Sequence, residues 1–570
     1  MHKFEFVNRN YEMLEQQEKP KQFTYSDEKD HKKKPRWRKF TLTVSVLALF
    51  IIGIAVYFAK RENHSIVTET AGSGADKMPG NGNGSTSEKT PSGQLPAAGL
   101  SAEFEPEVMN EGAKASYKLA LEVKGENQFA ASAEIDVTNT SETNWNNLSV
   151  YFFPNQFGDL ARDQCRRKIV TFAVDKCLQE IGEGETAIEK VTFNGEELPY
   201  DLQGVQLKVP LKLALSTGKS GKLAITYTFS LPGNLIENDE YNLLQWHPIL
   251  PGYEREWLLH PLAIGKDTYS SFPSDITFSY NLPGKMQVVT SGTEPDSQSS
   301  SDTVAGKNLK EMFVMILNRH QMIKAQAGET EIRIFATAKQ KAQAAEALKT
   351  AKEAVAFFEK KLGGYPQQQL DIVLTETRQG NYPGVILQPG TIVEDKFSYF
   401  ETNESQEHLL VHQIAQQWFY GNVHFERHTD LWLNDGLSEL AASLFFLVGK
   451  KKSEEESFAF AKKFNEFSIM REEVKSNMPA DQYVGSFGGI VGHVQAKPAI
   501  LLWELIKPYG DETALAFLSD YLKTYSGKKL ATIEFIHFAK DYLKVDNHAF
   551  TGWLHYNPYS DYDMSDFYNL

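Results

Sequence analysis

Between about residues 101 and 330, apolar and polar residues alternate in short runs that are separated by turn residues. A period of two, in runs rich in Val, Thr, Tyr and Phe, is typical of half-buried β-strands. We therefore expect a largely antiparallel β-sheet domain over residues 101–330, acting as a scaffold. The runs are ASAEIDVTN, NLSVYFF, GVQLKVPLKL, KLAITYTFSLP, DITFSYNLP and MQVVTSGT.

The period changes after a last strand-like run, EIRIFAT. In KQKAQAAEALKTAKEAVAFFEKKLGG, apolar residues recur at helical spacing, and the final Gly pair suits a helix C-cap. LDIVLTET then predicts one strand, and most segments from residue 404 onward predict helices. We expect residues 331–555 to form a mixed, mainly helical domain, and the fold class to be multidomain α+β.

Residues 40–59, FTLTVSVLALFIIGIAVYFA, carry no charge over a length that matches the hydrocarbon thickness of a bilayer. A cleavable signal peptide is the competing interpretation. The segment begins late, is long for the apolar region of a signal peptide and lacks a clear small-x-small cleavage site. We therefore expect a retained N-terminal transmembrane helix.

The flanks of this segment predict its orientation. KKKPRWRK, residues 32–39, precedes it, whereas only Lys60 and Arg61 follow. By the positive-inside tendency, residues 1–39 form a cytoplasmic segment. Residues 60–100 are rich in Gly, Ser, Thr, Asn and Pro, which predicts a flexible linker. We expect a single-pass protein of the cell membrane with extracellular C-terminal domains.

Composition narrows the range of partners. The 59 Lys and Arg residues against 74 Asp and Glu residues give a net charge of −15, which makes nucleic acid an improbable partner. The two cysteines, Cys165 and Cys177, form either a disulfide or two buried thiols. The acidic, aromatic tail of residues 556–570 is either a solvated end or a docking peptide.

One predicted helix carries candidate chemistry. HLLVHQIAQQWFYGN, residues 408–422, follows a possible N-cap at Asn403 or Ser405 and reaches a stop at Gly421. His412 and Gln416 lie one turn apart and share a face. The opposite, apolar face consists of Leu410, Val411, Ile414, Ala415 and Trp418.

A zinc peptidase would have His-Glu-x-x-His at this place. Two imidazoles at positions i and i+4 can reach one ion, and the Glu between them acts as general base. Here Gln416 replaces the second imidazole and Gln413 replaces the base. An amide has no useful basicity near neutral pH, and losing a general base costs about 10²–10⁴ in rate.

The following segment, QQWFYGNVHFERHTDLWLNDGLSELAASLF, resembles the aminopeptidase N family of gluzincin zinc metallo-aminopeptidases. In that family a Trp-Leu-Asn-Glu-Gly helix carries the third zinc ligand, eighteen residues after the second His. Eighteen residues also separate Gln416 from Asp435. LLQWHPILPGYEREW, VVTSGTE and GNYPGVIL extend the resemblance over nearly all of the exterior part. It implies a β-saddle domain over 101–330 and a thermolysin-like peptidase domain over 331–555.

The resemblance also implies roles for single positions. His412, Gln416 and Asp435 take the three metal-ligand positions, and Gln413 takes the base. Asn381 stands where a Glu would hold the free amino group of a substrate, within a substrate-binding loop that includes Tyr382 and Gly384. In QAKPA, residues 495–499, Gln495 takes the place of the transition-state Tyr and Pro498 that of a Gly.

Almost every member of this catalytic set is changed, whereas Trp418, Asp430, Trp432 and Gly436 are retained. We therefore expect a membrane-anchored pseudopeptidase that binds a peptide or protein, with no cofactor. One alternative is an active zinc metallo-aminopeptidase with atypical ligands. Another is a subunit of an envelope or transporter complex, which would need membrane partners because no nucleotide-binding motif is present.

A relocated metal site is a further alternative. His408 precedes His412 by one turn, and Glu439 follows Asp435 by one turn on the next predicted helix. His424 and His428 form a second pair at helical spacing.

Overall fold

The computed structural model describes most of the chain beyond residue 96. The described residues are 97–125, 127–157, 184–232, 235–237, 240–260, 269, 271–376, 378–390, 403–469, 473–483 and 487–555. All of them belong to the second of two compact units, residues 92–570. The predicted cytoplasmic segment, the predicted span, nearly all of the linker, both cysteines and the C-terminal tail lie outside them. Among the described residues, no helix is long and apolar enough to span a membrane.

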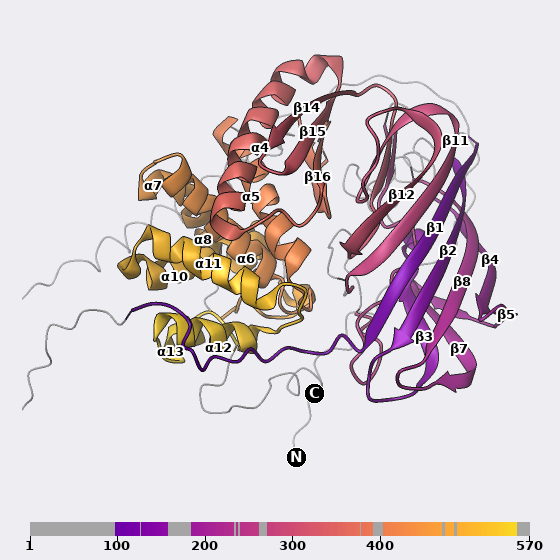
Figure 1. Ribbon diagram of the computed structural model, residues 1–570, viewed down its shortest axis with the longest axis horizontal. Helices are drawn as coiled ribbons and strands as arrows, with labels where there is room; N and C mark the ends of the chain where they lie inside the picture. Colours follow the sequence, from indigo (N-terminus) through magenta and orange to yellow (C-terminus); the bar gives the residue numbers. More distant parts are fainter. Residues whose placement is uncertain are drawn as a thin grey trace, which may run out of the picture. The chain divides into compact units, whose positions relative to one another are not determined.

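The sheet domain confirms the period-two pattern, and the protein is a multidomain α+β protein. Ten described strands form its largest sheet, in the order β5-β4-β8-β2-β1-β11-β13-β10-β9, with β12 paired to β11 (Figure 1). Their bounds are β1 Ala113–Gly125, β2 Gln128–Asn139, β4 Thr186–Phe193, β5 Glu196–Glu197, β8 Ser220–Ser230, β9 Ile236–Glu237, β10 Glu240–Leu243, β11 Ser274–Thr290, β12 Ser299–Leu309 and β13 Val314–Leu317.

A second sheet of three described strands has the order β3 (Trp145–Tyr151), β7 (Gln206–Leu215) and β6 (Asp201–Gln203), and η1 (Phe153–Gln156) follows β3. Alternate residues of these strands are buried in one core with the ten-stranded sheet, for example Val150, Val209 and Ile225. DITFSYNLP and MQVVTSGT, expected as two strands, form the single strand β11. Its first part pairs with β1 and its last part pairs with β13, so one strand serves two sets of neighbours.

The peptidase-like domain begins with a five-stranded sheet in the order β14-β15-β16-β18-β17. Its strands are β14 Gln321–Ala327, β15 Thr330–Ala336, β16 Gln369–Thr375, β17 Gly380–Tyr382 and β18 Val385–Pro389. Helix α4 (Lys341–Leu362) connects the parallel strands β15 and β16 and lies along the sheet (Figure 1). It ends at Gly363, whose φ of 113° confirms the Gly stop, since side chains rarely adopt that backbone conformation.

The remaining described elements are mostly helices, as expected. They are α5 Asn403–Asn422, α6 Trp432–Leu444, η5 Phe445–Gly449, α7 Glu454–Ser457, α8 Ala459–Ile469, α9 Phe487–Ile490, η7 Val491–Ala496, α10 Lys497–Ile506, α11 Asp511–Tyr525, α12 Thr532–Leu543 and α13 His548–Thr551, with short 3-10 turns at Ala338–Gln340, Ala480–Gln482 and Lys507–Tyr509. Helices α5 and α6 pack on each other in the centre of this domain. They position the candidate site.

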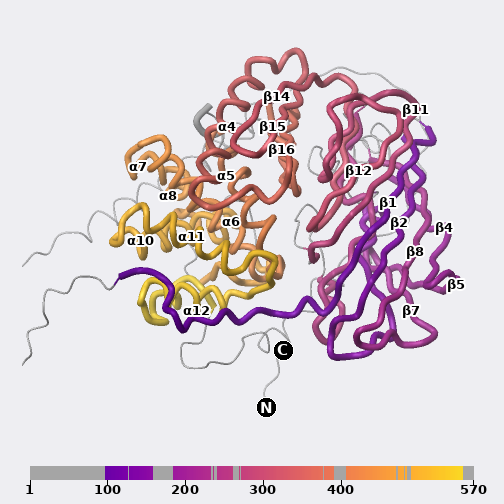
Figure 2. The backbone as a smooth tube through the Cα atoms, in the orientation of Figure 1, coloured from indigo at the N-terminus to yellow at the C-terminus, as the bar shows by residue number. Residues whose placement is uncertain are grey.

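Residues 98–112 form an N-terminal arm that precedes β1. Figure 2 shows this indigo arm running beside α12 before it enters the sheet domain. The backbone N–H of Gly99 donates to the carbonyl of Tyr542 at 2.9 Å, and that of Ser101 donates to the Asp541 carboxylate at 2.7 Å. Met109 N–H donates to the carbonyl of Lys529 at 2.9 Å. The arm is therefore bonded to α12 and to the loop that precedes it.

Candidate functional site

The three predicted ligand positions lie on two packed helices, His412 and Gln416 on α5 and Asp435 on α6. The Gln416 amide donates from Nε2 to Asp435 Oδ1 at 2.8 Å. His412 instead directs Nδ1 to Glu439 Oε2 at 3.0 Å. Gln416 and Asp435, the second and third predicted ligand positions, are therefore hydrogen-bonded to each other. His412, the first, contacts the carboxylate of Glu439 instead.

Backbone groups determine which way the Gln416 amide is turned. The carbonyl of Gln413 only accepts hydrogen bonds, and it receives Asn381 Nδ2 at 2.9 Å. The same Asn381 amino group donates to Gln416 Oε1 at 2.6 Å. Gln416 Nε2 must then face Asp435. An N–H group, and not an oxygen lone pair, points at the carboxylate from the second ligand position.

Gln417, which the sequence analysis did not single out, holds the predicted substrate-binding loop against α5. Its Oε1 accepts from the Gly384 N–H at 2.9 Å, and its Nε2 donates to the Tyr382 carbonyl at 2.9 Å and also to Asn381 Oδ1. It lies one turn after Gln413, so its spacing from that position was the available signal. The Asn381 amide is consequently engaged at both its oxygen and its nitrogen.

Tyr382 faces the interior of the protein. Its ring is buried and stacks on Phe313 of the sheet domain with centroids 4.1 Å apart. Gly384 has a φ of 73°, which allows the tight turn between β17 and β18. These two members of the predicted binding loop therefore shape the loop through packing and backbone conformation.

Gln413 occupies the family's base position and is buried. Its Nε2 donates to the Gly380 carbonyl at 3.1 Å, and its Oε1 has no hydrogen-bond partner among the described residues. The amide is bound to β17 through its nitrogen and cannot accept a proton near neutral pH. No general base is present at this position.

Glu439 is the centre of a buried polar cluster. Its two carboxylate oxygens contact His408 Nε2 at 2.9 Å and His412 Nδ1 at 3.0 Å. Gln495 of η7 adds a hydrogen bond from Nε2 to Oε2 at 2.9 Å. Burial alone would raise the pKa of the Glu439 carboxyl, but the two imidazoles outweigh it and hold that pKa at about 2. The carboxylate is therefore ionised under ordinary conditions.

Asp435 differs from Glu439. Its side chain is partly buried, and burial raises the pKa of its carboxyl above the ordinary value. The charges of His412 and Arg427 and the hydrogen bonds from Gln416 and Asn434 act in the opposite direction. The Asp435 carboxylate thus accepts hydrogen bonds from two amide side chains.

The donor set does not fit zinc. Zinc in proteins is usually held by four ligands such as His, Cys and carboxylates, and one neutral amide whose oxygen is already bonded is a poor substitute. Within the described parts of the chain, no group of three or more His, Cys, Asp or Glu side chains is arranged to hold a metal ion. The expectation that no cofactor binds stays a prediction.

The two histidine pairs considered for a relocated site differ in structure. His408 and His412 do share a helix face, and both contact Glu439. The helical spacing assumed for His424 and His428 is wrong, because the chain leaves α5 at Asn422 and no helix continues through these positions. His424 directs Nδ1 to Glu111 Oε1 at 2.9 Å, which joins the N-terminal arm to the helical domain.

Comparison with models of known protein families identifies the domain that carries this site. Residues 346–553 match the Peptidase family M1 domain. The chain contains a peptidase M1 domain. This confirms the resemblance that the Trp432 to Gly436 segment predicted. The M1 match covers α5, α6 and η7, and hence every position of the candidate site from Asn381 to Gln495.

Solved structures agree with the M1 match at the level of the fold. Crystal structures of the M1 zinc metallopeptidase from Deinococcus radiodurans and of a point mutant of it are 17% identical to this chain, with a TM-score of 0.53. The alignments cover 78–79% of this chain and 94–95% of the other. The mutant bound to a Tyr-Ser-Ala substrate gives a TM-score of 0.51. No curated protein matches by sequence.

Proposed function

We propose that this M1-related protein is a pseudopeptidase, which keeps the peptidase fold and uses it to bind a peptide or protein without hydrolysis. The hydrogen bond from Gln416 Nε2 to Asp435 Oδ1, 2.8 Å long, is the observation that carries the proposal. Where the family needs two ligands turned toward one cation, this chain has a donor and an acceptor turned toward each other. Each satisfies the other without an ion.

The chemistry around this pair supports the same proposal. Hydrolysis of a peptide bond needs an activated water, and metal binding is the means by which this family's fold supplies it. Gln413 cannot remove a proton from that water. Gln495 donates to Glu439 and has no acidic hydroxyl with which to stabilise a tetrahedral intermediate. Three separate catalytic tasks thus lack a competent side chain.

The proposal places the binding function outside the cell. The uncharged segment 40–59 and its basic N-terminal flank support a single-pass anchor with the described domains beyond the membrane. A peptide or protein ligand, or a membrane-complex partner, would then reach the M1 domain from the extracellular side. The acidic net charge of −15 keeps nucleic acid outside the proposed range of partners.

Zinc content and hydrolysis, measured on one preparation, test the proposal. The full chain is incubated with zinc, desalted and analysed for metal, and aminoacyl-coumarin amides are offered as substrates. We expect little zinc and no turnover from the wild-type chain and from His412→Ala. A variant with Gln413→Glu, Gln416→His and Asp435→Glu restores the family set, and we expect it to retain zinc.

Two outcomes would reject the pseudopeptidase. One is near-stoichiometric zinc in the wild-type chain that disappears in His412→Ala. The other is hydrolysis of aminoacyl substrates by the wild-type chain that a chelator abolishes. If the restored variant folds and still takes up no zinc, the Gln416 to Asp435 hydrogen bond is not what excludes the ion, and the argument from that bond fails.

A further inference from the structure

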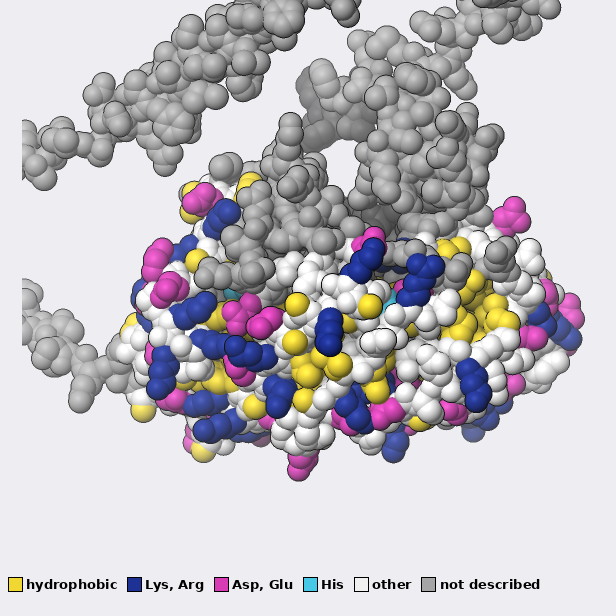
Figure 3. All heavy atoms as spheres, turned by 90° about the horizontal axis from the view of Figure 1, so that it is seen from above, with side chains coloured by type: hydrophobic (Ala, Val, Ile, Leu, Met, Phe, Trp, Pro, Cys, Tyr) yellow, Lys and Arg dark blue, Asp and Glu magenta, His cyan; other side chains and the backbone are white. Residues whose placement is uncertain are grey.

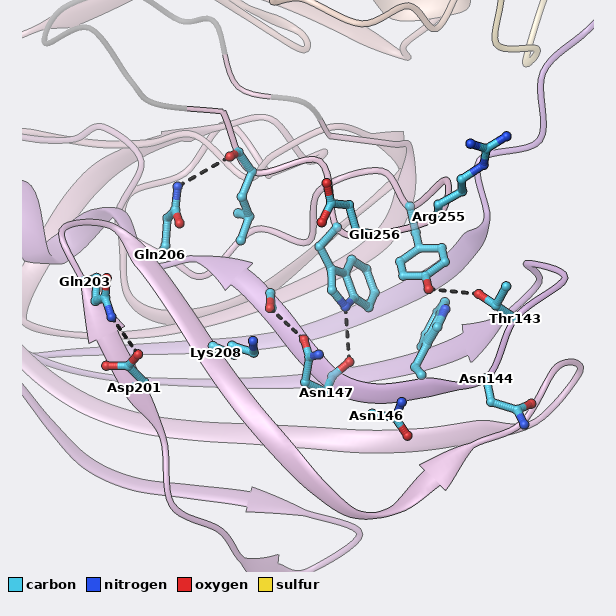
Figure 4. Close-up of a pocket in the computed structure, with 15 residues that line it drawn as sticks. Thr143, Asn144, Asn146, Asn147, Asp201, Gln203, Gln206, Lys208, Arg255 and Glu256 are labelled. Carbon is cyan, nitrogen blue, oxygen red and sulfur yellow. Dashed lines mark hydrogen bonds between the residues drawn. The ribbon is translucent and has the colours of Figure 1, made fainter. Parts of the chain in front are cut away.

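A polar pocket of about 670 Å³ lies in the sheet domain and shares no residue with the candidate site on α5 and α6. Its floor is the three-stranded sheet β3-β7-β6, and one wall is the segment that includes Tyr253 and Leu259. Figure 4 labels Arg255 and Glu256 of this wall, and Asn147, Lys208 and Gln206 of the floor. The volume falls within the roughly 300–1,000 Å³ typical of small-ligand sites. Nothing in the peptidase chemistry uses this pocket.

Strand register places a set of polar side chains on the floor. Lys208 of β7 pairs with Ser149 of β3 on one side and with Asp201 of β6 on the other. Two residues along β7, Gln206 pairs with Gln203 of β6. Because side chains alternate across a sheet, these residues share one face, and neighbouring strands set them about 4.8 Å apart.

The intervening residues explain why the floor is polar. Leu148, Val150, Leu207 and Val209 point to the opposite face and are completely buried in the core of the sheet domain. The core therefore fixes the register of the three strands, and a one-residue slip would bury the polar face. The polar face is a stable platform whose side chains the core does not use.

Aromatic residues make the wall rigid. Trp257 donates its indole N–H to the Asn147 carbonyl at 3.1 Å, and its ring packs on Trp145 with centroids 4.7 Å apart. The Tyr253 hydroxyl is bonded to Thr143 Oγ1 at 2.9 Å. Trp257 thus joins the wall to the floor directly at β3.

Several polar atoms of the pocket remain available to a ligand. Asn147 uses Oδ1 to accept from Ser149 at 3.0 Å, which leaves its Nδ2 without a bond to any described residue. Gln206 uses Nε2 to reach the Leu259 carbonyl at 3.4 Å, which leaves Oε1 similarly unused among the described residues. A donor and an acceptor therefore face the same space from neighbouring strands.

Charge narrows the class of ligand. The lining contains two acidic side chains, Asp201 and Glu256, and two basic ones, Lys208 and Arg255. Their charges sum to zero, so neither an anion nor a cation is favoured over a neutral molecule. Carboxamide side chains both donate and accept hydrogen bonds, and so do hydroxyl groups. A neutral ligand with many hydroxyls satisfies these groups most fully.

We propose that this pocket binds a neutral oligosaccharide. Hydroxyl groups of the sugar bond to the Asn147 and Gln206 amides, and the Trp257 wall contacts the apolar edge of a sugar ring. An extended peptide would instead add a strand at the open edge of the sheet. One edge, β6, is only three residues long, from Asp201 to Gln203, which is too short for a stable added strand. At the other edge, β3, the Asn147 carbonyl already accepts from Trp257, and the N–H and carbonyl of Tyr151 already bond to Ile249.

The binding test uses the full chain in a detergent without a sugar headgroup. Maltotetraose, cellotetraose and chitotetraose are titrated by calorimetry, with a polyuronate and a neutral tetrapeptide as the other probes. Asn147→Ala and Gln206→Ala each remove one free amide from the pocket. Gln326→Ala removes an exposed amide from β14, outside the pocket, and serves as the matched control.

We expect at least one neutral tetrasaccharide to bind, with affinity lowered about tenfold in each pocket variant and unchanged in Gln326→Ala. The proposal is overturned if none of the three sugars binds. It is also overturned if a sugar binds equally to both pocket variants, or if the polyuronate or the tetrapeptide is the ligand that the pocket variants lose. Circular dichroism verifies that each variant is folded. Zinc content is not measured in this test. The pseudopeptidase proposal can therefore be rejected while the sugar-site proposal is retained.

Discussion

Carboxamide side chains make most of the polar contacts at the positions where a peptidase would have charged groups. Asn381, Gln413, Gln416 and Gln417 bond to one another, to backbone groups and to Asp435. Each amide has two ends of opposite character, so a network of this kind has a defined orientation at every member. At the scale of single residues, the site therefore resembles a buried structural network that connects α5 to the β17–β18 loop.

Gln417 gives a sharp test of that network. In Gln417→Glu the side chain keeps its shape, but its carboxylate presents an acceptor to the Tyr382 carbonyl in place of a donor. We expect this variant to lose about 1–3 kcal/mol of unfolding free energy in chemical denaturation, nearly as much as Gln417→Ala. The exposed Gln326→Glu is the control and should change little. Equal stability of Gln417→Glu and wild type would contradict the network.

A second prediction at this scale concerns pH. His247 is buried, accepts the Met312 N–H at Nε2 and bonds the Pro248 carbonyl through Nδ1, so it is neutral in the fold. Burial lowers the pKa of this imidazole from 6.5 to about 4, although the bond to Pro248 opposes the shift. The unfolded chain takes up a proton near pH 6.5 and the folded chain only near pH 4. Stability is therefore lost as pH falls through this window.

The expected loss from His247 is about 3 kcal/mol between pH 6.5 and 4. Denaturation of wild type and His247→Gln at several pH values isolates it, because the other titrating groups are common to both chains. The difference in unfolding free energy between the two chains should shift in favour of the variant as pH decreases. A constant difference across the window would show that His247 does not titrate as the buried geometry requires.

The sequence predicts the identity of the site positions more fully than their contacts. The eighteen-residue interval from Gln416 to Asp435 predicted that these two positions lie close together, and the structure joins them by a hydrogen bond. Which amide atom faces which partner depends on the Gln413 carbonyl and on Asn381, two elements away in the chain. Gln417 escaped notice because two of its partners are backbone atoms of Tyr382 and Gly384, which carry no residue-type signal.

At the scale of elements, α6 and α10 pack so closely that no side chain fits at Gly436 without a shift of its neighbours. A β-carbon added there would lie 2.7 Å from Cβ of Pro498, closer than real carbon atoms approach. Pro498 lies near the start of α10, which continues directly from η7. The close approach of these helices brings Gln495 and Glu439 together at 2.9 Å.

Gly436→Ala should therefore destabilise the protein by about 1–3 kcal/mol, despite the better helix propensity of Ala. Gly552→Ala is the matched control, because a β-carbon there meets nothing within 4 Å. Pro498→Gly removes the contacting ring, so the double variant Gly436→Ala with Pro498→Gly should lose less than the sum of the single variants. If the losses of unfolding free energy measured by denaturation are additive, the two positions are not in contact.

The periodicity of apolar residues predicted elements well where only one face is buried. It predicted burial poorly where neighbouring elements cover every face. The alternating runs became β2, β3, β7 and β8, and the Ala-rich run became α4. Helix α5 was expected to have one apolar face, but His408, His412 and Gln413 on its other faces are buried as well. A helix that lies at the centre of its domain is covered on all sides, which no local pattern reveals.

At the scale of the whole molecule, the described face seen in Figure 3 carries charges of both signs close together. Lys and Arg side chains alternate with Asp and Glu over the face seen in Figure 3, with no large area of one sign among the described atoms of that view. Such a surface favours solubility and gives little steering toward a charged partner. Recognition would then depend on shaped sites such as the sheet pocket.

We expect the N-terminal arm, residues 98–112, to open without unfolding of the sheet domain. Phe104 packs on Phe538 and on His537 of α12, with ring centroids 6.0 and 4.9 Å away. We expect Phe104→Ala to speed amide exchange of residues 99–109, about tenfold for each 1.4 kcal/mol lost, while β1 stays protected. Glu103→Ala, an exposed neighbour, is the control. Faster exchange across β1 as well would mean that the arm and the sheet open as one unit.

The same arm has a consequence for how the protein is made. Ser101 finds its partner, Asp541, 440 residues further along the chain. A ribosome synthesises about 5–20 residues per second, so on the order of half a minute separates the two partners during synthesis. The sheet domain can fold in this interval, whereas the arm must wait for α12. A truncated product that lacks the last helices would leave the arm unbound, and proteases that cleave exposed segments would then degrade it.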